Sequence, residues 1–177
     1  REMGRLVDLQ PLETWLPKRS ASKNRVLDAF EEAVVRFGIA GASFSRIAEI
    51  GGFHRSLVQH HYRRREELIT EALDRIIEVY IARQALILHN TEPDKHSEAL
   101  VDWLLGPFGP EGPLRIGQVL DAYQALANTD FEVGRRLRGL YEHLIDGIDA
   151  ALGHRYPRAG RTRRLNVAFA VVCMSFG

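Results

Sequence analysis

The sequence predicts an all-α protein, with an N-terminal three-helix domain linked by a long helix to a second helical domain. Apolar residues recur at helical spacing along nearly all of the 177 residues, and no stretch shows the strict alternation of a half-buried strand. A pair of glycines at 51 and 52 separates two short helical segments. These observations divide the chain into an arm at 1–21, a helix-turn-helix domain at 22–66 and a helical domain at 67–177.

The first helix of the N-terminal domain is expected to begin at Ser22, a residue type that caps helix N-termini. Gly38 should end it, because glycine tolerates the left-handed backbone that often follows a helix. Between these two residues the helix carries an apolar face made of Leu27, Phe30, Val34 and Phe37. This spacing predicts one amphipathic helix that packs on the rest of its domain.

Two short helices follow, joined by a turn that contains Gly51 and Gly52. The first helix has an apolar face of Phe44, Ile47, Ala48 and Ile50. Phe53 is expected to anchor the turn in the core, and the second helix to bury only Leu57, Val58 and Tyr62. Its outward face then carries Arg55, Ser56, Gln59 and His60. Arg and Gln pair bidentately with base edges, so this pattern predicts a helix-turn-helix that lies against DNA.

The segment from Ser43 to Leu68 resembles the DNA-binding domain of the TetR family of bacterial transcriptional regulators. The residues that match the family pattern as they stand are Ser43, Ile47, Ala48, Gly52, Leu57, His61, Glu66, Glu67 and Leu68. Replacements of the same chemical kind are Phe44, Phe53, Val58, Tyr62 and Arg65. The resemblance extends upstream into the first helix, from Val26 to Gly38.

The resemblance implies a cytoplasmic, nucleoid-associated bacterial regulator, most simply a repressor, that binds a double-stranded DNA operator as a homodimer without a cofactor. The candidates for base contacts are Arg55, Ser56, Gln59 and His60, with Ser45 on the preceding helix. His54, at the start of the second helix, is a further DNA-binding candidate. The candidates for phosphate contacts are Ser43, His61, Arg63 and Arg65.

The second domain should begin with a long helix that carries an apolar stripe from Ile69 to Ile81, and further helices are expected at 98–105, 114–127, about 132–152 and 161–177. By resemblance this domain would bind a small apolar or aromatic effector and form the dimer. The candidate ligand-binding residues are Trp103, Phe108, Tyr123, Tyr141 and His143. The expected dimer surface lies on the last two helices, with Val167, Ala168, Ala170, Val171 and Met174 prominent.

The composition of the chain bears on its binding partner, its disulfides and its relation to membranes. Residues 1–70 hold 12 Lys and Arg against 9 Asp and Glu, whereas residues 71–177 hold 12 against 14, so the positive charge is concentrated in the N-terminal part. The single cysteine, Cys173, excludes an internal disulfide and is expected to be buried. The longest apolar segment, 167–176, is too short to cross a bilayer, and the first twenty residues lack a secretory signal.

Two other classes of function stay open. One is a helical adaptor whose helix-turn-helix binds protein or mediates dimerisation only. The other is a small helical enzyme, which the sequence disfavours because it has no H-E-x-x-H zinc pair, no Gly-rich phosphate loop and no G-x-S-x-G nucleophile elbow. His54, His60 and His61 lack the i, i+4 spacing of helical metal ligands, so no metal site is expected.

Overall fold

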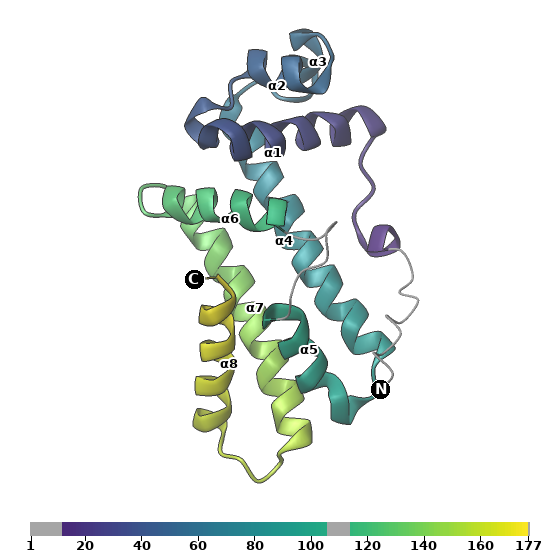
Figure 1. Ribbon diagram of the computed structural model, residues 1–177, viewed down its shortest axis with the longest axis vertical. Helices are drawn as coiled ribbons and strands as arrows, with labels where there is room; N and C mark the ends of the chain where they lie inside the picture. Colours follow the sequence, from purple (N-terminus) through teal and green to yellow (C-terminus); the bar gives the residue numbers. More distant parts are fainter. Residues whose placement is uncertain (1–11, 106–113, 177) are drawn as a thin grey trace. The chain divides into compact units, whose positions relative to one another are not determined.

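The computed structural model describes residues 12–105 and 114–176, and within these ranges every regular element is helical (Figure 1). The predicted all-α class is therefore confirmed for this part of the chain. In chain order the elements are η1 (Leu12–Trp15), α1 (Ala21–Gly41), α2 (Phe44–Gly51), α3 (Arg55–His61), α4 (Arg65–Asn90), η2 (Pro93–Lys95), α5 (His96–Leu105), α6 (Leu114–Ala127), α7 (Phe131–Arg155) and α8 (Arg161–Phe176).

The helices form two compact units, and two of the boundaries between them fall inside α4 and α7. We call residues 17–77 and 114–137 the head unit, and residues 12–16, 78–105 and 138–176 the body unit. The head unit is larger than the domain expected at 22–66, because α6 packs on α1. Its Tyr123 is fully buried and donates a hydrogen bond of 2.6 Å to the carbonyl of Ile69 on α4.

Single residues set the start of α1 and a break near its end. The N-cap is Ser20 rather than Ser22, and its side chain accepts a hydrogen bond from the backbone N–H of Lys23. The helix begins earlier than predicted because Ser20, not Ser22, has the extended backbone that a cap requires. The sequence predicts that the helix ends at Gly38; instead Gly38 breaks it, with φ of 68° and ψ of 169°, a conformation nearly restricted to glycine, and a further helical turn runs on to Gly41.

The core of the head unit is apolar, and ion pairs surround it. Its fully buried residues include Val26, Leu27 and Phe30 of α1, Ile47 of α2, Val58 of α3, and Leu68 and Leu73 of α4. Arg75 of α4 pairs with Asp28 at 2.8 Å and with Glu31 at 2.6 Å, both on α1. Although burial opposes its charge, hydrogen bonds from Lys23 and Arg19 lower the pKa of Glu71. These pairs tie α1 to α4 and so fix the base on which α2 and α3 lie.

The body unit contains the end of α4, together with α5, most of α7 and α8, around Leu100, Leu140, Leu144, Ile148 and Ala168. Cys173 of α8 is exposed, which corrects the prediction that it is buried. The apolar segment that contains it is amphipathic rather than buried all round, with Ala168, Val171 and Val172 facing inward. No helix among the described residues is both long and apolar enough to cross a membrane.

Replacing Gly38 by Ala should lower the free energy of unfolding by about 1–3 kcal/mol, because only its backbone conformation disfavours a side chain. A Cβ at Gly38 would meet nothing within 4 Å, so steric collision does not contribute. Gly117 on α6 is also open to a Cβ but is helical, and Gly117→Ala should raise stability by about 0.5–1 kcal/mol. Urea unfolding followed by circular dichroism measures both, and equal effects of the two variants would contradict this account of Gly38.

Candidate DNA-binding surface

The turn between α2 and α3 is built by two glycines with different roles. Gly52 ends α2 with φ of 63°, and its N–H donates to the carbonyl of Glu49 at 3.3 Å. Gly51 leaves space for the ring of Phe53, since a Cβ at Gly51 would lie 1.9 Å from Phe53 Cε1. The N–H of Phe53 donates to the carbonyl of Ala48 at 3.1 Å. The predicted helix-turn-helix is thus present, and its turn excludes larger residues at position 51.

Helix α3 has seven residues, of which Val58 alone is fully buried. Tyr62, which ends the helix, is also buried, and that burial raises its pKa. The remaining face of α3 is exposed, and it carries Arg55, Ser56, Gln59 and His60, as the sequence predicts. His54 precedes the helix, is exposed, and makes no side-chain capping hydrogen bond. The hydrogen-bonding groups of these residues are available to a molecule that lies along α3.

Helix α2 adds polar groups at its N-terminus. Ser43 is the N-cap and accepts a hydrogen bond from the backbone N–H of Arg46 at 3.3 Å. Ser45 and Arg46 are exposed on the first turn. Sequence reasoning missed Arg46, whose guanidinium donates to the carbonyl of Gly41 at 2.9 Å and lies 4.8 Å from the ring centroid of Phe37. An anion is stabilised at a helix N-terminus, so Ser43 and Arg46 are both suitably placed for a phosphate.

The side chain of His61 already has a hydrogen-bonding neighbour within the head unit. Its Nε2 lies 3.0 Å from Oγ of Ser22, at hydrogen-bond distance. Burial, with smaller effects from His60 and Lys23, lowers the pKa of His61. The lowered pKa favours the neutral imidazole, which can offer a phosphate a hydrogen bond.

The three consecutive arginines after α3 have three different environments. The side chain of Arg65 donates to the carbonyl of Ala42 at 3.3 Å and also to the carbonyl of Ile39. Arg64 pairs with Glu67 at 3.1 Å. Arg63 is exposed, and among the described residues none is hydrogen-bonded to its guanidinium. Of the two arginines among the four predicted phosphate contacts, Arg63 has an exposed guanidinium, whereas that of Arg65 is bonded to backbone carbonyls of the head unit.

The fold is similar to that of several solved regulators. A transcriptional regulator from Saccharomonospora viridis, solved in complex with choline, has a TM-score of 0.75 and 17% identity over 90% of this chain and 83% of that one. A transcriptional regulator from Rhodococcus sp. Rha1 has a TM-score of 0.68 and 23% identity over 89% and 84%. A TetR-like regulator from Rhodococcus sp. RHA1 has a TM-score of 0.62 and 15% identity over 91% and 85%. No family model and no curated protein matches the sequence.

The chain has the TetR-like fold. The resemblance read from the segment 43–68 predicted this fold, and the comparison confirms it over about 90% of the chain. In this TetR-like fold the helix-turn-helix of α2 and α3 lies in the head unit, packed on α1.

The predicted ligand-binding residues are not gathered in one unit of the TetR-like fold. Tyr123 belongs to the core of the head unit, whereas Trp103 and Tyr141 are half-buried in the body unit. His143 is exposed on α7, a position that does not favour a pocket lining. Phe108 lies outside the described residues. Only Trp103 and Tyr141 therefore remain together as candidates.

The predicted dimer surface divides between two faces of α8. Ala168 and Val171 are buried within the protomer, because they face its own core. Val167 is 45% exposed and Met174 is 65% exposed, and Ala170 is exposed between them. Phe169, which the sequence analysis did not single out, is 59% exposed. We call Val167, Phe169, Ala170, Cys173 and Met174 the outer face of α8.

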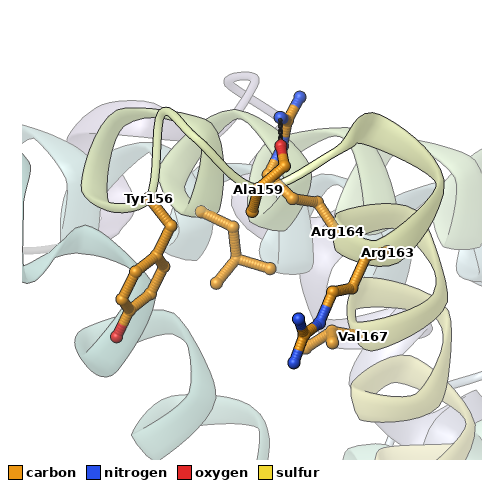
Figure 2. A pocket seen from close by; sticks show the side chains of 6 residues that line it. Tyr156, Ala159, Arg163, Arg164 and Val167 are labelled. Carbon is orange, nitrogen blue, oxygen red and sulfur yellow. Dashed lines mark hydrogen bonds between the residues drawn. The ribbon is translucent and has the colours of Figure 1, made fainter.

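A hollow of about 370 Å³ lies where α7 turns into α8 (Figure 2). Leu152, Tyr156, Ala159, Arg163, Arg164 and Val167 line it. Arg164 is held in place, because it donates to Asp149 at 2.9 Å and to the carbonyl of Ala159 at 2.7 Å. None of the predicted ligand-binding residues takes part, so this hollow and the Trp103–Tyr141 region are separate features of the body unit.

Arg65→Met should lower the free energy of unfolding by about 1–3 kcal/mol, since two carbonyls lose a charged donor. It should leave the salt dependence of DNA binding almost unchanged. Arg63→Met should instead reduce the slope of log K against log salt by about 0.9, with little effect on stability. Arg64→Met is the matched control for the loss of one arginine, because Arg64 pairs with the side chain of Glu67 and not with the backbone carbonyls that Arg65 contacts. Binding titrations at several salt concentrations, together with urea unfolding, test these outcomes, and a loss of slope in Arg65→Met alone would reverse the assignment.

Proposed function

We propose that the protein is a sequence-specific DNA-binding transcriptional regulator, acting as a repressor whose homodimer binds a pseudo-palindromic operator. A small-molecule effector bound in the body unit would change its affinity for DNA. It would do so only by binding one state of the dimer more tightly than the other.

The observation that carries this proposal is the exposed face of α3. A seven-residue helix that buries Val58 and leaves Arg55, Ser56, Gln59 and His60 in solvent gains little from packing on its own protein. Arg and Gln can each make two hydrogen bonds to one base edge in the major groove. We assign base contacts to these four residues, with His54 and Ser45 next to them.

Local charge supports DNA as the partner. Residues 43–65 contain five arginines and one glutamate, although the whole chain carries a net charge of only +1. We assign phosphate contacts to Ser43, Arg46, Arg63 and His61. Contacts of this kind position a protein on the duplex without reading its sequence.

The outer face of α8 supports a homodimer. It exposes a large aromatic and a methionine next to Val167, Ala170 and Cys173, on a helix that already packs its inner face in the protomer. Several exposed apolar side chains on one side of a helix are typical of a surface that a partner covers. In a two-fold dimer two recognition helices would enter successive major grooves about 34 Å apart.

An effector is supported by the comparison with known structures. The Saccharomonospora viridis regulator with the same fold was solved with choline bound. In the present chain we assign the effector to the body unit. The chemical class of the effector has to follow from the residues that line its site.

Selection of bound sequences from random duplexes tests the regulator proposal directly. The full chain should select a pseudo-palindrome whose half-site centres are about 10 base pairs apart. Arg55→Ala should relax selectivity at one symmetric pair of positions, at a cost of about 1–3 kcal/mol. Val35→Ala, on an exposed residue of α1, should leave the selected sequence unchanged. Failure to enrich any sequence, with protein partners captured by the α3 face instead, would favour an adaptor.

Val167→Glu should convert the dimer to a monomer, because the substitution buries two carboxylates at a two-fold interface. Val35→Glu is the matched control, since Val35 is 38% exposed and Val167 is 45% exposed in the protomer. Analytical ultracentrifugation should therefore show a monomer only for Val167→Glu. A wild-type monomer, or a dimer that tolerates Val167→Glu, would remove the outer face of α8 from the proposed interface.

A further inference from the structure

Four aromatic side chains from four different helices meet in the body unit. They are Tyr80 of α4, Trp103 of α5, Tyr141 of α7 and Phe176 of α8. The ring centroids are 5.9 Å apart for Tyr80 and Trp103, 5.5 Å for Tyr80 and Phe176, and 5.2 Å for Tyr141 and Phe176. We call these four residues the ring cluster.

The ring cluster differs from the aliphatic core in its exposure. Each of its four side chains is only partly buried, whereas the aliphatic residues around them, such as Leu104 and Leu140, are almost fully buried. The rings are tilted by 42° to 58° to one another, as packed aromatic pairs commonly are. Because each ring is only partly buried, part of its surface stays open to a ligand, and the face of an aromatic ring attracts cations.

Gln84 lies one helical turn after Tyr80 on α4 and is only 3% exposed. Neither its Oε1 nor its Nε2 has a hydrogen-bond partner among the described residues. The amide lies so close to α7 that a Cβ on Gly147 would be 1.8 Å from Nε2. A buried amide without partners costs free energy that an apolar side chain of similar size would not cost. Its presence therefore points to a partner that the described residues do not supply.

The orphaned amide and the ring cluster lie at adjacent levels of the same bundle. Tyr80 and Gln84 are about 6 Å apart along α4, and Tyr141 and Gly147 are about 9 Å apart along α7. Tyr80 is linked to Tyr141 through the ring of Phe176, and Gln84 lies against Gly147. A molecule a few carbon atoms long could thus contact the rings at one end and the amide at the other.

We propose that the ring cluster and Gln84 form the effector site, and that the effector is a small quaternary ammonium compound with a hydroxyl or carbonyl group. This inference rests on the proposed function, because it names the ligand class of the regulator. A methylated ammonium has an apolar surface and no N–H to satisfy, so aromatic faces can hold it. The Gln84 amide, which offers both a donor and an acceptor, pairs with the polar end.

Calorimetric titration of the full chain with choline tests the site. The comparison ligand is the neutral carbon analogue of choline, in which a tert-butyl group replaces the trimethylammonium. The proteins are wild type, Tyr80→Leu, Gln84→Met and, as the matched control, Tyr156→Leu, which removes a half-exposed tyrosine from the hollow at the α7–α8 turn.

Wild type and Tyr156→Leu should bind choline at least tenfold more tightly than the neutral analogue, and Tyr80→Leu should lose this preference. Tetramethylammonium lacks the hydroxyl group of choline. Gln84→Met should bind the two compounds with equal affinity, because methionine has no amide to pair with that hydroxyl. Without ligand, Gln84→Met should melt about 2–4 °C higher than wild type, since it removes an unpaired buried amide. If Gln84 instead stabilised the folded protein, Gln84→Met would have a lower Tm than wild type.

Three results would overturn the inference: equal affinity for choline and its neutral analogue, loss of binding in Tyr156→Leu rather than in Tyr80→Leu, or a lower Tm in Gln84→Met. DNA selection in the absence of choline separates this inference from the proposed function. A protein that selects an operator but shows none of the expected ligand preferences would keep the regulator and lose the site. A protein that binds choline as expected but selects no DNA would keep the site and lose the regulator.

Discussion

The hydrogen bonds that Arg65 donates to the carbonyls of Ile39 and Ala42 hold the recognition segment together. They join the first residue of α4 to the turn that precedes α2, so α2 and α3 lie on a chain segment that is closed at both ends. Helix α3 needs this support because it is short and buries only Val58 in full. The exposed face of α3, to which we assign the base contacts, is thus held in place by contacts made outside the helix itself.

The two helices that carry the helix-turn-helix, α1 and α4, are themselves joined by ion pairs as well as by apolar contacts. Arg75 forms ion pairs with Asp28 and Glu31, and Glu71 forms ion pairs with Lys23 and Arg19. Both sets are partly buried, so their attraction is screened less than that of a surface pair. The hydrogen bond from Tyr123 to Ile69 adds α6 to the same frame. The head unit therefore includes elements far along the chain from the helix-turn-helix.

The sequence could predict the features whose cause is local. Gly38 breaks a helix and Gly52 ends one through their own backbone preference, and the outward face of α3 follows from helical spacing. The role of Arg65 could not be predicted, because a basic residue next to Arg63 and Arg64 is equally suited to phosphate or to backbone carbonyls until its distant neighbours are known. The same reason applies to His61, whose partner Ser22 is 39 residues away. The exposure of Cys173 depends on which side of α8 packs inward, and an apolar run leaves that undecided.

The two units differ in how far sequence alone can lead to function. Every duplex presents the same phosphates and grooves, so arginine, glutamine and serine on a short helix indicate DNA whatever its sequence. A small effector has no such constant feature, and Trp103 and Tyr141 are equally good core residues when seen in isolation. Gln84 distinguishes the two explanations, because burying both its amide atoms without partners among the described residues opposes folding. A residue that works against stability beside accessible aromatic rings is better explained by a ligand than by packing, since packing alone would favour methionine or leucine at this position.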